Sequence, residues 1–99
     1  MEVVYSRRAR RDIEDIHDRI ADVNPIAAER VVSSIIAKCD RLAFFPGSAN
    51  RTDEPQVYRL PVVHYRYTIF YRVTSDQDLV EIVRIVHSSR VKNLRHIPR

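Results

Sequence analysis

The chain has 99 residues, 44% of them hydrophobic, and a formal net charge of +4. This composition favours a single folded domain over residues 1–99, and we expect a cytoplasmic protein because the sequence shows neither a long apolar segment for a bilayer nor the apolar core of a signal peptide. The positive charge favours an acidic partner, either nucleic acid or an acidic protein segment. Arginine far outnumbers lysine, which fits bidentate recognition of phosphate or carboxylate and fits equally a genome rich in arginine codons.

The first 42 residues predict one short strand and two helices. Glu2–Tyr5 is β-prone, and Ser6 can cap a helix with a narrow apolar stripe. That stripe consists of Ala9, Ile13, Ile16 and Ile20. Asn24 and Pro25 are typical of a helix start, so a second helix should follow a tight corner. Its apolar band is wider and predicts deeper burial: Ala28, Val31, Val32, Ile35, Ile36, Cys39 and Leu42.

The rest of the chain predicts an exposed loop and three strands. Residues 44–56 are rich in turn-forming residues, and β-branched and aromatic residues crowd the sequence from about Val57 onward. The short turn at 74–78 should join consecutive strands in antiparallel pairing. The predicted fold class is therefore α+β, in the order β-α-α-β-β-β, with a helical hairpin packed on one face of a small antiparallel sheet.

Alternation along the strands predicts which side of the sheet meets the helices. The tyrosine side of the middle strand is the better candidate for core: Tyr65, Tyr67, Ile69, Tyr71 and Val73. The last strand is apolar on both faces, with Val80, Ile82 and Val86 on one and Leu79, Val83 and Ile85 on the other. Either the chain's own ends or another protein must cover the second face, and we favour a partner chain.

Four arginines open the first helix, where the helix dipole disfavours cations: Arg7, Arg8, Arg10 and Arg11. They form either a solvated face or a docking site for an acidic partner. In the first case Arg8 should pair with Asp12, Arg10 with Glu14 and Arg11 with Asp15. In the second, Arg7 and Arg11 are the candidates for partner binding.

Four more arginines lie on or beside the predicted strands: Arg59, Arg66, Arg72 and Arg84. Long cations are costly to bury without a partner, so we expect them on the face away from the helices. There they bind an acidic partner or phosphates, or else they pair with Glu81, Asp76 and Asp78. We favour binding, with Arg59, Arg66 and Arg72 as the candidate residues.

Residues for metal-free RNA cleavage are present, although nothing in the sequence brings them together. Such cleavage needs a base, an acid and cations for the phosphorane charge, and the candidates are His64, His87, Arg84 and Arg90. A histidine at a strand end is more often structural. The histidines lack metal-ligand spacing, and Cys39 on an apolar stripe is more typical of a buried residue than of a reactive thiol, so we expect no metal or other cofactor.

Motifs in order along nearly the whole chain resemble the ParE/RelE toxin superfamily of bacterial toxin-antitoxin systems. They are Tyr5-Ser6, Ala9 with Asp12-Ile13, Pro25 with Ala27-Ala28, Leu42 before Pro46-Gly47, Tyr58-Arg59-Leu60, Tyr65 with Tyr71-Arg72-Val73, and Ile82 through Arg84 to His87 and Arg90. The resemblance implies the fold predicted above. It also implies a ParD-like antitoxin that lays an acidic amphipathic segment across the helices and the sheet.

The run Tyr71-Arg72-Val73 and the His87 to Arg90 ending are similar to the ParE branch. That branch implies a noncatalytic toxin that binds DNA gyrase and stalls it on cleaved DNA. Ribosome-dependent mRNA cleavage, as in RelE, is the alternative, and an inactive member of the fold is a third. Few lysines and no tyrosine after Tyr71 count against the RNase, whereas Ser88 and Ala49-Asn50 depart from the ParE pattern.

The C-terminal segment from His87 to Arg99 is the predicted target contact of a ParE-like toxin. Its candidate residues are His87, Arg90, Lys92 and Arg95, with His96 and Arg99 following. These residues have no evident structural role in the predicted fold, although a disordered basic tail would have the same composition. The mechanisms predict different mutational behaviour: a steep loss at His87 or Arg90 for an RNase, and a gradual loss across the tail for a binding toxin.

Overall fold

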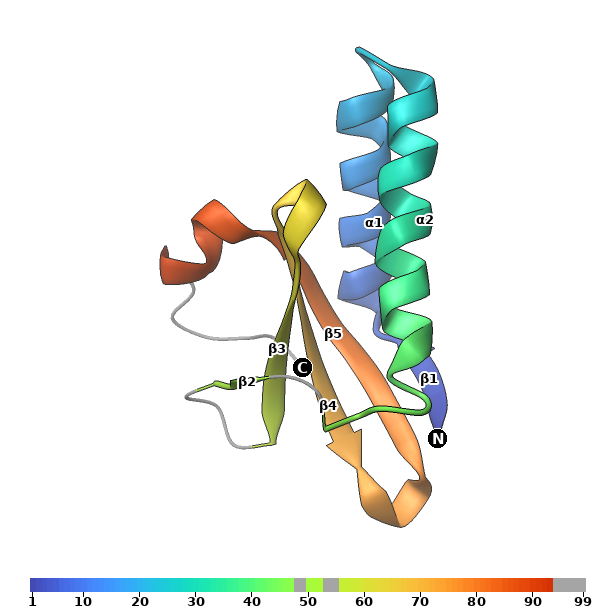
Figure 1. Ribbon diagram of the computed structural model, residues 1–99, viewed down its shortest axis with the longest axis vertical. Helices are drawn as coiled ribbons and strands as arrows, with labels where there is room; N and C mark the ends of the chain where they lie inside the picture. The colour runs from blue at the N-terminus through green and yellow to red at the C-terminus, as the bar shows by residue number, and fades with distance from the viewer. Residues whose placement is uncertain (48–49, 53–55, 94–99) are drawn as a thin grey trace.

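Two helices lie along one face of a twisted sheet in the computed structural model, which describes residues 1–47, 50–52 and 56–93 (Figure 1). The helices are α1 (Arg7–Ala21) and α2 (Pro25–Arg41). The strands are β1 (Glu2–Tyr5), β2 (Asn50–Arg51), β3 (Val57–Val62), β4 (Tyr67–Thr74) and β5 (Leu79–His87). The predicted β-α-α-β-β-β order is confirmed, with the two-residue β2 added inside the loop that was expected to be irregular.

Both helices begin where the sequence predicts. The Ser6 side chain accepts a hydrogen bond from the Ala9 N–H at 3.0 Å, and the Asn24 side chain accepts one from the Ala27 N–H at 3.1 Å. Pro25 occupies the start of α2, where its missing N–H costs nothing. The Ser6 hydroxyl also donates to the Val83 carbonyl at 2.9 Å, so the start of α1 is tied to β5.

The sheet has five strands in the order β1-β5-β4-β3-β2. Strands β3, β4 and β5 form the predicted antiparallel meander. Strand β1 pairs parallel to β5, from Glu2 opposite Leu79 to Tyr5 opposite Ile82, so the sheet is mixed rather than wholly antiparallel. The long connection through the helical hairpin permits the parallel pairing, which a tight turn would not.

A β-bulge changes the predicted faces of β5. Phe70 pairs with Arg84 while Tyr71 pairs with Ile82, so Val83 is the extra residue. Beyond the bulge the alternation is inverted: Ile85 lies in the helix-side core and Val86 on the opposite face, the reverse of the prediction. The tyrosine side of β4 is correctly predicted, because Tyr67, Ile69 and Tyr71 join the helix-side core.

The face away from the helices is buried within the chain itself. Val57, Phe70, Val83 and Val86 are at most 5% exposed, and Val91 of the 3₁₀ helix η3 (Ser88–Asn93) packs against them. The expectation that this face requires a partner chain is therefore wrong for these four residues. Val91 belongs to the C-terminal end of the chain, so the cover here is the alternative that the sequence analysis offered beside a partner chain.

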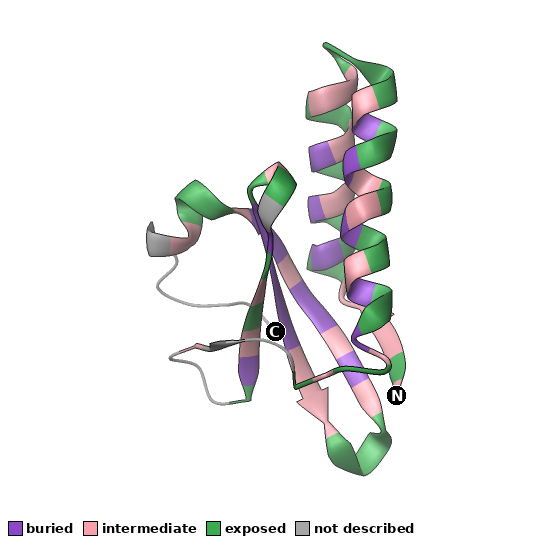
Figure 2. Cartoon of the chain, in the orientation of Figure 1, coloured by how far each residue is buried: buried purple, intermediate pink, exposed green. Residues whose placement is uncertain are grey.

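Helix α2 is the more buried helix, as predicted, but its apolar band is narrower than expected. Ala28, Val31, Ile35, Cys39 and Leu42 are buried, whereas Ile36 is 38% exposed. Figure 2 shows the buried residues on the sides of the helices that face the sheet. The band narrows because α1 and the sheet cover only one side of α2.

Candidate functional site

Asp12 forms the most heavily bonded polar site within the described residues. Its carboxylate accepts hydrogen bonds from Arg84 Nε at 2.9 Å, from Arg84 Nη2 at 3.2 Å and from the Ile85 N–H at 2.9 Å. Arg8 Nε lies 3.4 Å from Asp12 Oδ1, which confirms the predicted ion pair between residues one helical turn apart. Asp12 is 5% exposed, so burial is compensated by charged and backbone donors.

Arg84 therefore does not lie on the face away from the helices, and that expectation is wrong. Strand β1 ends opposite Ile82, so α1 rather than another strand lies beside the next residues of β5. Asp12 accepts from the Ile85 N–H at this uncovered edge, and the Arg84 guanidinium donates to the same carboxylate. The sequence signal that was missed is a carboxylate at position 12, between Ala9 and Ile16 on the buried stripe of α1.

His87 ends β5 in a defined local structure. Its Nδ1 accepts from the Ser89 N–H at 3.2 Å and lies 2.7 Å from the Ser89 hydroxyl, while its ring meets the Tyr67 ring edge-on at 5.4 Å between centroids. Because Nδ1 is an acceptor here, the neutral ring carries its proton on Nε2. Arg90 follows in η3 and is exposed.

The turn between β3 and β4 lies at the same end of the sheet as η3. The Ser88 N–H donates to the Arg66 carbonyl at 2.7 Å, and the Thr68 and Ser88 hydroxyls are 3.0 Å apart. His64 and Arg66 are exposed in this turn, and Arg66 adopts the left-handed conformation with φ of 57°. The fold thus brings the two predicted segments together, but in the described ranges no interaction joins His64 to His87.

The other arginines for which the sequence predicted binding or pairing lie apart from the Asp12 site. Arg72 pairs with Glu81 across β4 and β5 at 3.6 Å and is largely buried, as the pairing alternative proposed. Arg59 is exposed on β3, and Arg7 and Arg11 are exposed on α1. Of the three expected pairs along α1, only Arg8 with Asp12 forms within residues 1–47. The side chain of Lys92 is not described, and Arg95, His96 and Arg99 lie outside the described residues.

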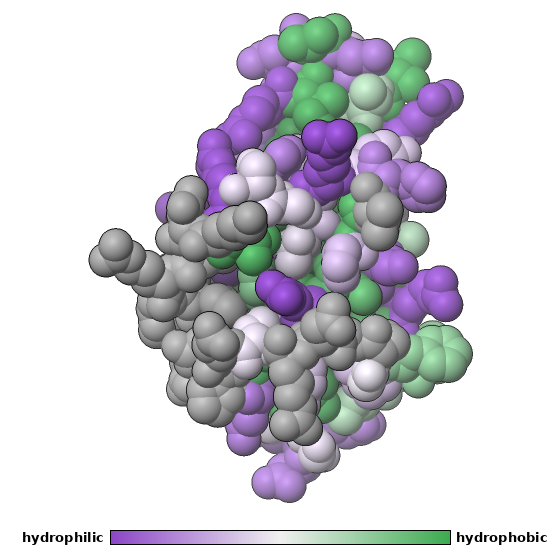
Figure 3. All heavy atoms as spheres, turned by 60° about the vertical axis from the view of Figure 1, so that its left-hand side comes forward, coloured by the Kyte–Doolittle hydropathy of each residue, from purple (hydrophilic) through white to green (hydrophobic). Residues whose placement is uncertain are grey.

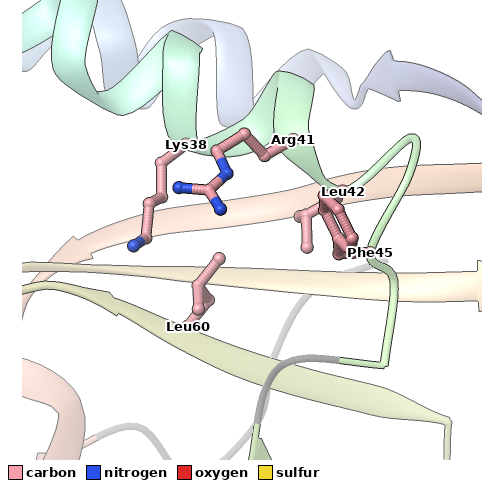
Figure 4. Close-up of a pocket in the computed structure, with 5 residues that line it drawn as sticks. All are labelled: Lys38, Arg41, Leu42, Phe45 and Leu60. Carbon is pink, nitrogen blue, oxygen red and sulfur yellow. The ribbon is translucent and has the colours of Figure 1, made fainter.

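A hollow of about 290 Å³ opens between the end of α2 and strand β3 (Figure 4). Lys38, Arg41 and Leu42 line it from α2 and its end, Phe45 from the following loop, and Leu60 from β3. Phe44 and Phe45 are 80% and 58% exposed. The loop is anchored where the Tyr71 hydroxyl donates to the Pro46 carbonyl at 2.6 Å. Sequence reasoning did not identify this surface.

Other chemistry finds little support among the residues that the structure covers. No three His, Cys, Asp or Glu side chains there are grouped as metal ligands, and no helix in those ranges is long and apolar enough to span a membrane. Cys39 is buried as predicted, and burial raises the pKa of its thiol to about 12. The thiol therefore stays protonated near neutral pH and is not an activated nucleophile.

Residues 3–92 match the family described as ParE toxin of type II toxin-antitoxin system, parDE. The chain belongs to this family. It is also 36% identical over 90 residues to Toxin RelE2 of Caulobacter vibrioides, a match that covers 91% of this chain and 98% of that protein. The chain is thus a type II toxin of the ParE/RelE superfamily.

Solved structures share the fold. A chain of the chromosomal ParDE system from P. aeruginosa matches with a TM-score of 0.76 at 23% identity, covering 88% of this chain and 95% of that chain. The isolated E. coli RelE toxin matches with a TM-score of 0.60 at 12% identity, covering 93% of this chain and 88% of that chain. A chain of the RelBE2 complex from Mycobacterium tuberculosis matches with a TM-score of 0.56 at 21% identity, covering 87% of this chain and 95% of that chain. These likenesses confirm the predicted fold class.

Proposed function

We propose that this cytoplasmic toxin inhibits growth by binding DNA gyrase and stalling it on cleaved DNA, and that a ParD-like antitoxin neutralises it. The observation that carries the proposal is the ParE family match over residues 3–92. The chemistry of the end of the sheet supports it. Arg84, a cation that RNA cleavage would need, is engaged by buried Asp12, whereas Arg90 is exposed and His87 is partly exposed.

The target surface in this proposal is the segment that begins at His87 and continues through Arg90, Lys92 and Arg95. The exposed arginines Arg7, Arg11, Arg59 and Arg66 supply positive charge for the acidic antitoxin. Arg72 is a weaker candidate than the sequence implied, because Glu81 already compensates its charge.

The test is a gyrase supercoiling reaction with plasmid and purified chain, read for lost supercoiling and for linear DNA after detergent and protease. We expect linear plasmid with the unmodified chain and a graded loss as Arg90, Lys92 and Arg95 are changed to alanine in turn. Arg19→Ala, an exposed arginine on α1, is the matched control. Unaffected gyrase at high toxin concentration would refute the proposal.

The identity to Toxin RelE2 favours a second candidate, ribosome-dependent mRNA cleavage. In that mechanism the 2′-hydroxyl attacks its own phosphate, so a base and an acid are required. In this candidate His87 would act through Nε2, the ring nitrogen that Ser89 does not engage, while His64, Arg84 and Arg90 supply the remaining roles. Adding the chain to a translation reaction and probing the mRNA ends tests this candidate. Cut mRNA with unaffected gyrase, lost in His87→Ala, would replace the first proposal.

A further inference from the structure

Strand β5 extends past the strand beside it. Strand β1 ends at Tyr5 opposite Ile82, whereas β5 continues to His87 (Figure 1). In the described part of the chain, no other strand pairs with this edge of β5. Backbone N–H and C=O groups at an open strand edge lack ladder partners, so the end of β5 needs another means of support on this side.

The beginning of α1 supplies that support. The Ser6 N–H donates to the Ile82 carbonyl at 2.9 Å, and the Ser6 hydroxyl donates to the Val83 carbonyl at 2.9 Å. Further along α1, the Asp12 carboxylate accepts from the Ile85 N–H at 2.9 Å. The residue that caps α1 and a side chain of α1 thus take the place of a strand beside the last residues of β5.

Asp12 does more than replace one ladder hydrogen bond. Its carboxylate also accepts from Arg84 Nε at 2.9 Å and from Arg84 Nη2 at 3.2 Å. One side chain therefore holds a guanidinium and the backbone of the next residue together, which fixes the orientation of the strand as well as its distance from α1. Figure 3 shows many hydrophilic residues at the surface, in purple, but Asp12 is 5% exposed. A carboxylate is rarely buried so deeply unless it is paired.

Stability alone does not explain a charged pair at this position. The attraction within a buried ion pair is largely offset by the cost of removing both charges from water, so apolar side chains of similar volume often hold two elements together equally well. The pair adds direction, because a bidentate contact between a guanidinium and a carboxylate favours one geometry whereas apolar contacts permit many. Asp12 and Arg84 are therefore suited to hold the end of β5 in one orientation.

The segment proposed to contact the target follows directly. His87 ends β5 two residues after Ile85, and the exposed Arg90 follows in η3. Strand β4 holds the same stretch from the other side, where Tyr67 lies opposite His87. The end of β5 is thus held along both edges, by β4 on one and by Asp12 on the other, just before the chain leaves the sheet.

We propose that Asp12 is a positioning residue for target binding. It acts through Arg84 and the Ile85 N–H to fix the direction in which His87 and the residues after it leave the sheet. Asp12 itself is buried and does not contact the target. The inference rests on the proposed function for what this segment binds, but the placement of the segment is measurable without a target.

The experiment compares the full chain with variants that separate position from stability. Asp12→Asn keeps the shape and one acceptor oxygen but loses the charge. Arg84→Lys keeps the charge but loses the bidentate contact. Ile35→Val and Ile35→Ala, in the core on α2, lower the free energy of unfolding without changing a group of this site. Together they bracket the loss of stability expected for Asp12→Asn.

Two readouts are taken for each variant, amide hydrogen exchange by NMR and inhibition of gyrase supercoiling. The local probe is the Ser88 N–H, which donates to the Arg66 carbonyl just after β5, and the reference is the amides of β3. We expect Asp12→Asn to speed exchange at Ser88 about ten-fold relative to β3 and to weaken inhibition by about ten-fold, as the loss of one charged hydrogen bond implies. Arg84→Lys should have the same effects at about three-fold. The Ile35 variants should change exchange alike in both regions and inhibit gyrase like the unmodified chain.

The controls determine which conclusion fails. Equal inhibition by Asp12→Asn and by Ile35 variants of the same urea midpoint would mean that Asp12 only stabilises the fold, and the inference would be overturned. Unchanged relative exchange at Ser88 in both site variants would overturn it as well. If Asp12→Asn does not fold, Arg84→Lys decides by the same two readouts. If the unmodified chain leaves gyrase unaffected, the proposed target is refuted, and exchange at Ser88 still decides whether Asp12 positions the segment.

Discussion

The cations around Asp12 and those around the α2–β3 hollow are similar in type but differ in surroundings. Arg84 and Arg8 lie against a carboxylate that is 5% exposed, and their charges hold α1 against β5. Lys38 and Arg41 lie beside exposed Phe45 and half-buried Leu60, with no carboxylate within 4 Å of them in the described part of the chain. The contrast teaches that a cation paired with a buried acid serves stability, whereas a cation without an ion pair contributes little to it.

The largest expected effect is at the buried pair. Asp12→Ala removes the partner of Arg84 and of the Ile85 N–H, and breaking a buried ion pair costs about 3 to 5 kcal/mol. Urea unfolding should show a lower midpoint and an unchanged slope. Asp12→Asn, which keeps an acceptor oxygen but loses the charge, should cost less. If both variants unfold like the unmodified chain, the stabilising role of this site is wrong.

A smaller effect is expected where the sheet anchors the loop beside the hollow. Tyr71→Phe removes the hydrogen bond to the Pro46 carbonyl and should cost about 1 kcal/mol. Tyr58→Phe, on the ring stacked against Tyr71, is the control for a lost hydroxyl. Equal midpoints of urea unfolding for Tyr71→Phe and Tyr58→Phe would mean that the bond to Pro46 adds no stability.

A weak pH dependence is expected from a histidine outside both regions. Hydrogen bonds to Glu29 and Asp18 raise the pKa of His17, and the contact to Glu29 joins α1 to α2. A raised pKa means that this stabilisation is complete below the ordinary pKa of 6.5 and is lost as the pH rises through the folded value. The melting temperature of His17→Gln should therefore fall below that of the unmodified chain in acid and converge with it at alkaline pH. A constant difference across that range would contradict the assignment.

The smallest expected effect on folding is at the two cations beside the hollow. Changing Lys38 and Arg41 together to alanine should alter the free energy of unfolding by less than about 0.5 kcal/mol, because neither forms an ion pair in the described structure. The same urea series used for Asp12→Ala measures it. A loss comparable to that of Asp12→Ala would mean that these cations are structural after all.

Local sequence patterns determined most of the fold. Ser6 and Asn24 mark both helix starts, the spacing of apolar residues identifies the buried sides of both helices, and the alternation of β4 identifies its core face. These features depend on neighbours a few residues apart, so they can be inferred without knowing where distant segments lie. The motifs distributed along the chain were likewise enough to predict the toxin superfamily.

Only the tertiary structure decided the features that depend on distant segments. A single extra residue at Val83 inverts the faces of β5, and the packing of α1 beside this strand brings Asp12 to Arg84, 72 residues later in the chain. The hollow exists only because the end of α2 lies over β3, where Lys38 and Arg41 meet Leu60. Alternation cannot locate a bulge, and charge alone cannot tell a paired arginine from one available to a partner, because both depend on which segments the fold brings together.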